Sequence, residues 1–164
     1  MVSVQERLER VQELVAAVPD PEIPVVTIED LGILRDVAAT YDGRIVVTLT
    51  PTYSGCPAID PIRNDVERAV SDAGIADVEV RLQLAPAWTT DWLSQPGRAK
   101  LEAYGIAPPA PVAGSGCPIV DSTPRCPRCG SRDTRLLSRF GATPCQAQHA
   151  CNDCLEPFDA FKSL

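Results

Sequence analysis

The sequence CPRC at residues 126–129, matched by CNDC at residues 151–154, decides more about this chain's fold than any other stretch. Each is a Cys-x-x-Cys turn that holds two thiolates close together, and 21 residues separate the two turns. Two such turns complete a tetrahedral shell of four sulfurs, a geometry that zinc accepts. The predicted ligands are Cys126, Cys129, Cys151 and Cys154. Because the protein fills all four positions, we expect a structural zinc site rather than a catalytic one.

The alternative is that these residues are unrelated thiols or form two disulfides. The N-terminus argues against disulfides, since it carries Glu6, Glu9 and Glu13 where a signal peptide has a basic segment followed by an apolar one. Seven cysteines without an export signal indicate a reducing cytoplasm, where thiols stay free or bind metal. No run of about 18 apolar residues is present, so we expect no membrane span.

Length and charge restrict the possible classes of protein further. The chain of 164 residues is long enough for one ordinary domain and a small second one. Residues 1–124 hold nine basic and eighteen acidic side chains, whereas residues 125–164 hold six and four. An acidic body repels phosphate backbones, so nucleic acid is not expected to be the main partner.

The first two thirds of the chain predict an α/β (α+β) domain, with a small sheet of three or four strands packed against helices. Ser3 and Glu6 have the spacing of a capping box before the first apolar helix face, which Pro19 and Pro21 end. The predicted strands are residues 33–37, 45–50 and 78–84, and the predicted helices are residues 4–18, 58–73 and 98–104. Trp88 and Trp92 would share a face if that stretch is helical; we expect core packing, and an interface is the alternative.

Composition changes after residue 106. Residues 107–124 contain five prolines and two glycines with few large apolar side chains, so we interpret this segment as a linker. The expected domains are therefore an α/β domain over residues 1–106, the linker, and a C-terminal zinc β-ribbon over residues 125–164.

The stretch TPTYSGCPA, residues 50–58, joins the second predicted strand to the second predicted helix. It places Cys56 just before a helix N-terminus, whose partial positive charge favours a thiolate and lowers a thiol pKa. Thr52 and neighbouring hydroxyl groups lie beside it in sequence. This arrangement suits a reactive thiol or a metal ligand. A small buried cysteine beside a tight turn is an equally good interpretation.

A second cluster is the sequence DPEIP at residues 20–24. Asp20 and Glu22 could bind a metal or polarise a thiol, but carboxylates between prolines more often cap turns and helices, and we favour capping. The chain has one histidine, His149, inside the ribbon, and it shows no P-loop or GxGxxG pattern.

These motifs together resemble a known family. The stretches DPEIPVVTIEDLGILRDV, TLTPTYSGCPAID and PAWTTDWLSQPGRAKLEAYGIAPP look like the α/β domain of SufT-like iron–sulfur assembly proteins. The C-terminal CPRCGS, FGATPCQA and CNDCLEPFDAFK look like the zinc ribbon of the PaaD-type branch. That branch is the D component of the phenylacetyl-CoA epoxidase (phenylacetate oxygenase) system. Close relatives often carry a further cysteine where this chain has Ser163, so a metal site that needed that thiol could not form here.

The resemblance implies a non-catalytic accessory protein that assists iron–sulfur or iron-centre maturation in phenylacetate degradation. It implies that Cys56 transiently handles iron or an iron–sulfur cluster, with Asp20, Glu22 and Thr52 in support, beside the structural zinc. The implied partners are the oxygenase and the iron–sulfur reductase subunits. Whether the protein forms a homodimer is left open. We assign no role to Cys117 or Cys145.

Three other functions are considered as alternatives. The protein could be a structural adaptor subunit without a role in metal transfer. A thiol enzyme is the weakest alternative, because no base or resolving partner for Cys56 is visible. A nucleic-acid-binding ribbon is disfavoured because four thiolates around one zinc ion remove two charges from the ribbon's small positive balance.

Overall fold

The computed structural model describes residues 3–110 and 123–163, and their contacts group the chain into unit 1 (Met1–Trp88) and unit 2 (Thr89–Leu164). Cys117 and most of the predicted linker lie outside the described residues. Residues 89–106 group with the ribbon, whereas the sequence pattern placed them with the α/β domain. The domain boundary after residue 106 stays a prediction about folding units.

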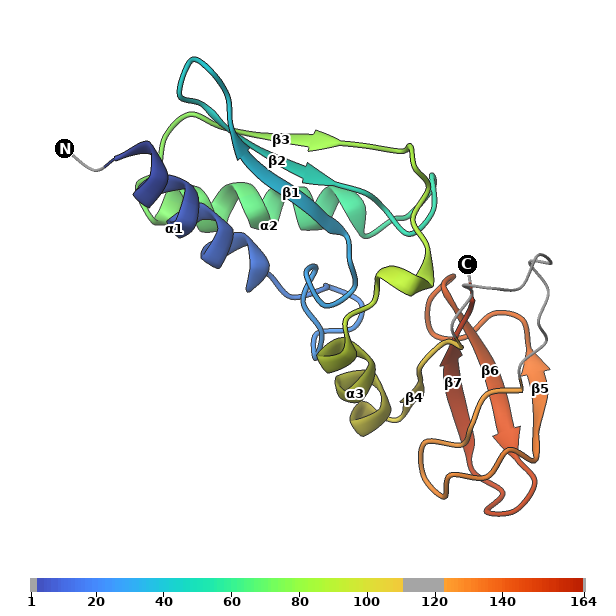
Figure 1. The fold of residues 1–164 in the computed structure, drawn as a ribbon. Coiled ribbons are helices and arrows are strands. Elements are labelled where there is room, and N and C mark those ends of the chain that lie inside the picture. Colours follow the sequence, from blue (N-terminus) through green and yellow to red (C-terminus); the bar gives the residue numbers. More distant parts are fainter. Residues whose placement is uncertain (1–2, 111–122, 164) are drawn as a thin grey trace. The chain divides into compact units, whose positions relative to one another are not determined.

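Unit 1 contains two helices and one three-stranded sheet, as the sequence predicts (Figure 1). The helices are α1 (Val4–Ala16) and α2 (Ile59–Asp72), and the strands are β1 (Leu34–Ala39), β2 (Ile45–Leu49) and β3 (Val78–Leu82). Strand β2 lies in the centre, antiparallel to β1 and parallel to β3. Helix α2 makes the connection between the two parallel strands, which is the usual way to join them.

Local signals explain where α1 begins and where α2 ends. The Ser3 hydroxyl accepts the N–H of Glu6 at 3.1 Å, and the Glu6 carboxylate accepts the N–H of Ser3 at 2.7 Å, which is the predicted capping box. After α2, Gly74 adopts a left-handed backbone (φ 71°) that reverses the chain toward β3.

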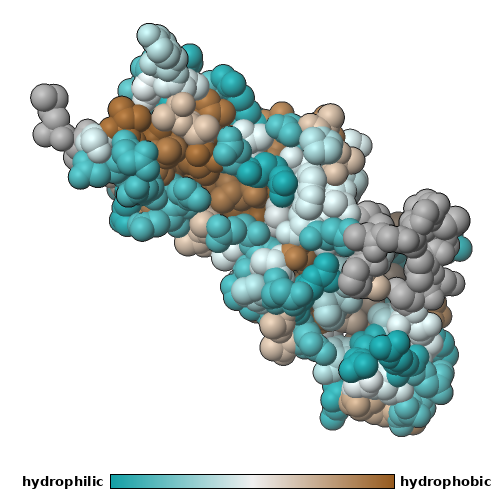
Figure 2. Space-filling model, viewed as in Figure 1, coloured by the Kyte–Doolittle hydropathy of each residue, from teal (hydrophilic) through white to brown (hydrophobic). Residues whose placement is uncertain are grey.

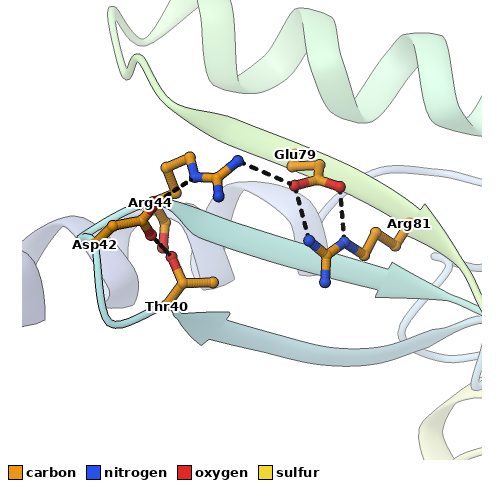
Figure 3. A network of polar contacts seen from close by, with 5 residues as sticks. All are labelled: Thr40, Asp42, Arg44, Glu79 and Arg81. Atoms are coloured by element: carbon orange, nitrogen blue, oxygen red, sulfur yellow. Dashed lines mark hydrogen bonds and ion pairs between the residues drawn. The ribbon is translucent and has the colours of Figure 1, made fainter.

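The core of unit 1 lies between the sheet and the two helices. It consists of aliphatic side chains from both layers. The most deeply buried are Val11, Val15, Ile28, Ile33, Ile45, Val47, Leu49, Ile62 and Val66. Figure 2 shows that the apolar surface in this view gathers over α1, α2 and β1. The helices lie on one face of the sheet (Figure 1), and Glu79 and Arg81 of β3 project from the opposite face (Figure 3).

Unit 2 begins with a 3₁₀ turn (Thr90–Trp92) and α3 (Gln95–Tyr104), which ends at Gly105 in the left-handed region (φ 95°). A four-stranded sheet follows in the order β4-β7-β6-β5. Its strands are β4 (Ile106–Ala107), β5 (Thr134–Ser138), β6 (Gln146–Cys151) and β7 (Pro157–Phe161). Strand β4 was not predicted, because two residues are too few to show a periodicity.

Trp88 and Trp92 do not lie in one helix, so the condition for a shared helix face is not met. Trp88 precedes the 3₁₀ turn and is 5% exposed, so it packs in the core, whereas Trp92 ends the turn and is half-buried.

Within residues 3–110 and 123–163, none of the helices has the length and apolar character needed to cross a membrane.

Candidate metal centre and thiol loop

The ribbon brings its four predicted ligands together. The four cysteine sulfurs all lie within 4.8 Å of one another, with 3.7 Å between Cys126 and Cys154 and 3.5 Å between Cys129 and Cys151. A zinc ion with four Zn–S bonds of about 2.3 Å would place its sulfurs about 3.8 Å apart. These separations fit a tetrahedral thiolate shell and are well beyond the roughly 2.05 Å of a disulfide bond.

The two Cys-x-x-Cys turns have the same backbone geometry. The N–H of Cys126 donates to the carbonyl of Ser131 at 2.8 Å, and the N–H of Cys151 donates to that of Glu156 at 3.0 Å. In each turn the residue after the second cysteine is left-handed, with φ 75° at Gly130 and 63° at Leu155. Glycine adopts this conformation readily, but a leucine in the same conformation could not be foreseen from its sequence.

Backbone amides in the second turn stabilise sulfur in its charged form. The N–H of Cys154 lies 3.5 Å from the Cys151 sulfur and donates to it. This hydrogen bond is the chief reason why the pKa of Cys151 falls to about 7. A thiolate is the form that binds metal. The Ser131 amide lowers the pKa of Cys129, but hydrogen bonding with the Cys151 sulfur and burial outweigh that effect and raise this pKa to about 12, and the pKa of Cys154 is also raised.

Little apolar packing supports this centre. The buried cluster of the ribbon contains Ala107, Cys126, Cys151, Phe158 and Ala160, so two of its five members are predicted ligands. Polar pairs join the two turns from outside, between Arg128 and Glu156 and between Ser131 and Asp153. We therefore expect a ribbon with so small a core to depend on its metal for stability.

Cys145 and His149 lie outside the four-sulfur cluster. Cys145 is buried, and its sulfur lies 2.9 Å from the Thr143 hydroxyl, with which it shares a hydrogen bond. The ring of His149 stacks on Phe158 with a centroid distance of 5.8 Å. Neither residue belongs to the group of four sulfurs, which consists of the four predicted ligands.

In unit 1, Cys56 lies on the predicted connection between β2 and α2. Its N–H donates to the carbonyl of Tyr53 at 3.1 Å, and α2 begins at Ile59, three residues later. The residue is half-buried, so Cys56 is neither a fully buried core residue nor a fully exposed one.

Buried hydroxyl groups precede this thiol. Thr50 is 1% exposed and Thr52 is 8% exposed. The Thr50 Oγ1 is buried without a hydrogen-bond partner among the described residues. Thr52 is the predicted supporting residue, and only the structure reveals the unsatisfied oxygen of Thr50. The sequence signal available for Thr50 was its place at the end of an alternating strand pattern.

The structure gives Asp20 the capping role. Its Oδ1 accepts the N–H groups of Glu22 at 2.9 Å and Ile23 at 2.8 Å, and the side chain is 5% exposed. Burial raises the pKa of Asp20, against the lowering effect of those two hydrogen bonds. Glu22 is exposed, and its pKa is raised by partial desolvation and by the charge of Asp20. Within the described residues, no hydrogen bond or ion pair connects Asp20 or Glu22 with Cys56.

Comparisons with known proteins agree with this two-part description. A family model described as an iron–sulfur cluster assembly protein matches residues 8–82, and one described as the PaaD zinc beta ribbon domain matches residues 117–162. In fold, the chain is similar to a crystal structure of a domain of unknown function, DUF59, from Bacillus anthracis. That similarity has a TM-score of 0.54 and 29% identity, over 59% of this chain and 92% of the other.

Curated relatives fall into two groups. Over 92% of this chain and 90% of the relative, the sequence is 47% identical to the D component of the "Putative 1,2-phenylacetyl-CoA epoxidase" of Escherichia coli (strain K12). Over 57% of this chain and 89% of the relative, it is 36% identical to an "Fe-S protein maturation auxiliary factor" of Porphyromonas gingivalis (strain ATCC BAA-308 / W83).

The fold and the four-cysteine centre thus define an iron–sulfur assembly domain joined to a zinc ribbon. More specifically, the chain belongs to the PaaD-type family, in which these two domains occur together.

Proposed function

We propose that this protein is a non-catalytic accessory factor of the phenylacetyl-CoA ring-epoxidase system, which assists the assembly of an iron–sulfur cluster or an iron centre in that system. The similarity to an epoxidase component over nearly the whole chain supports the pathway, and the maturation factors that match unit 1 support the role. The proposal places the protein in the cytoplasm, where its thiols stay reduced.

The observation that carries the proposal is the half-buried thiol of Cys56 on the loop before α2. Soft sulfur ligands favour iron and iron–sulfur clusters. In this proposal the cluster or iron ion is cargo, held briefly by Cys56 and released to a client. A single thiol leaves most of the coordination shell to other ligands, which suits transfer better than storage.

Unit 1 supplies the position of that thiol. The hydrogen bond from Cys56 N–H to Tyr53 and the start of α2 hold the loop, and the Thr50 hydroxyl is buried beside its beginning. In this proposal the contribution of Asp20 is indirect, because it stabilises the conformation of its own turn. The zinc ribbon contributes a stable second module that can contact the client.

The oxygenase and iron–sulfur reductase subunits are the expected clients. The test compares their iron and sulfide content after purification from cells that carry wild type, Cys56→Ser or no copy of the gene. Lower metal and sulfide content with Cys56→Ser supports maturation. Cys117→Ser is the matched control, because it removes a thiol to which the sequence assigns no role.

A structural adaptor is the second candidate, since the E. coli relative is described as a subunit. An adaptor would co-purify stably with the oxygenase and would leave the metal content of its partners unchanged. Equal iron, sulfide and activity in all three strains would therefore reject maturation in favour of the adaptor.

A further inference from the structure

Strand β3 is an open edge of the sheet in unit 1. It pairs with β2 in regular parallel register from Val78 to Leu82, and within the described residues its other side has no paired strand (Figure 1). The opposite edge, β1, carries a bulge between Leu34 and Asp36. Bulges, prolines and inward charges are the devices that protect edges from pairing, and β3 contains neither a bulge nor a proline.

The hydrogen bonds of β2 show which backbone groups of β3 face outward. The N–H of Ile45 donates to the carbonyl of Asp77, and the N–H of Gln83 donates to the carbonyl of Leu49. Along a strand the main-chain groups of alternate residues point the same way, so the odd-numbered residues of β3 face β2. The N–H and C=O groups of Val78, Val80 and Leu82 therefore point away from the sheet and can pair with another strand.

A groove accompanies this edge on the helix side. It has a volume of about 160 Å³, and the apolar side chains that line it are Val70 and Ile75, with Val78 and Val80 from β3. Leu82, at the other end of the strand, is 38% exposed. One end of β3 thus offers an apolar groove, and the other end offers an exposed apolar side chain.

The opposite face of β3 carries two opposite charges on either side of Val80. Glu79 and Arg81 project from it, as Figure 3 shows, and the carboxylate accepts two hydrogen bonds from the guanidinium at 2.7 and 3.0 Å. Arg44, in the turn that leads into β2, lies 3.7 Å from the same carboxylate. All three side chains are largely exposed, so exchanging one exposed ion pair for another costs little.

We propose that β3 is the interface of a homodimer, in which two copies of the chain pair antiparallel about a two-fold axis at Val80. This register places Val80 opposite its own copy and Val78 opposite the second copy's Leu82. The outward N–H and C=O groups of all three residues then meet as hydrogen-bonded pairs, and the two sheets join into one of six strands.

The same register makes the side chains complementary on both faces. Glu79 lies opposite the Arg81 of the other copy at a non-hydrogen-bonded pair, where cross-strand side chains are closest. On the helix face, Leu82 of each copy lies against Val78 at the apolar groove of the other. A strand whose charges and apolar residues are arranged symmetrically about one residue is complementary to itself, which is why we choose a second copy as the occupant.

The test measures the mass of the full-length, zinc-loaded protein by light scattering and sedimentation over a range of concentrations. Wild type should form a dimer. Glu79→Arg and Arg81→Glu should each place like charges across the axis and raise the dimer dissociation constant about tenfold or more. The double variant Glu79→Arg/Arg81→Glu should restore the dimer, because the charges are only exchanged.

Mixing gives the sharpest result. In a one-to-one mixture of the two single variants, a heterodimer pairs opposite charges at both positions, so dimers should return although neither variant forms them alone. Asp36→Arg is the matched control, a charge reversal on an exposed residue of the other edge strand. It should leave the dimer unchanged.

A wild-type protein that stays monomeric at all concentrations would overturn the proposal, and would leave the edge to a strand from another protein. A dimer that both single variants leave intact, or that Asp36→Arg disrupts, would also overturn it, because its interface would lie elsewhere. The double variant contains both substitutions and therefore checks that each is compatible with folding.

Discussion

The indole N–H of Trp88 donates a hydrogen bond of 2.9 Å to the backbone carbonyl of Leu31, 57 positions earlier in the chain. Both residues are buried, at 5% and 2% exposure. This bond ties the end of unit 1 to the segment between its first helix and first strand. Replacing Trp88 with Phe keeps an aromatic ring there but leaves the carbonyl without that donor.

We therefore expect Trp88→Phe to lower the free energy of unfolding by about 1–3 kcal/mol, the cost of a buried polar group that loses its partner together with some lost packing. Urea denaturation followed by circular dichroism measures the change. Tyr41→Phe is the control, because Tyr41 is fully exposed and its substitution should leave the midpoint unchanged. An unaltered midpoint in Trp88→Phe would show that the bond contributes nothing.

Asp20 offers a test of pH dependence. Burial raises its pKa from the ordinary value of 3.8 in the folded protein. Its stabilising contribution is therefore complete below that value and is lost as the pH rises through the higher folded pKa. Asp20→Asn keeps an oxygen acceptor for the N–H groups of Glu22 and Ile23 without a buried charge. At neutral pH Asp20→Asn should be at least as stable as wild type. As the pH falls, the free energy of unfolding of wild type should increase relative to that of Asp20→Asn.

Asp20→Ala separates the hydrogen bonds from the charge. It removes both acceptor contacts of the turn, so we expect it to be less stable than Asp20→Asn by about 1–2 kcal/mol at every pH. Thermal unfolding at several pH values measures all three proteins. If Asp20→Asn is as unstable as Asp20→Ala at neutral pH, the capping explanation is wrong.

Metal removal should unfold the ribbon. Zinc binding contributes on the order of 10 kcal/mol in comparable small sites, and two of the five residues in the ribbon's buried cluster are predicted ligands. Cys129→Ser and Cys151→Ser should therefore lose zinc and expose the ribbon to protease. Metal analysis and limited proteolysis are the measurements. Cys145→Ser is the control and should retain one zinc ion per chain, since Cys145 bonds to Thr143 instead.

The left-handed residues after each Cys-x-x-Cys turn predict opposite effects. At Gly130 an added Cβ meets nothing within 4 Å, so Gly130→Ala should cost only the backbone strain, about 1 kcal/mol. Leu155→Gly removes such strain and should stabilise the ribbon by less than about 1 kcal/mol, because glycine's greater freedom in the unfolded chain offsets part of the gain. Competition with a chelator for zinc compares the two variants with wild type. Changes of the same sign in both variants would contradict this explanation.

The functional proposal predicts a growth phenotype. Loss of the gene should impair growth on phenylacetate, although the purified protein alone should show no epoxidase activity, since the sequence lacks the Glu-x-x-His pairs of a di-iron centre. Cys56→Ser should reproduce the defect with the fold of unit 1 intact by circular dichroism. Normal growth of the Cys56→Ser strain would remove the assigned role from this thiol.

Several features could be predicted because their causes lie within a few residues of one another. The capping box of Ser3 and Glu6, the reversal at Gly74 and the end of α3 at Gly105 each depend on local backbone geometry. The four ribbon cysteines were also predictable, because a Cys-x-x-Cys turn places its two sulfurs by spacing alone.

Other features depend on residues that only the fold brings together. Strand β4 has two residues and exists because β7 pairs with it, so no periodicity could predict it. The sequence only favoured a cap over a metal ligand for Asp20, and the positions of the Glu22 and Ile23 amides show the cap. The unsatisfied oxygen of Thr50 was equally hidden, because burial is a property of the packed chain.

The amino-acid sequence by itself determined the composition of this protein in modules: an acidic α/β body, a four-cysteine ribbon and the position of Cys56 before a helix. Spacing and local hydrogen bonding are sufficient for that. Only the tertiary structure decided that β2 lies between β1 and β3, that Trp88 reaches Leu31, and that β3 is left as an open edge. Such relationships join residues tens of positions apart, and they follow from which apolar faces can be buried together, a condition that no short stretch of sequence contains.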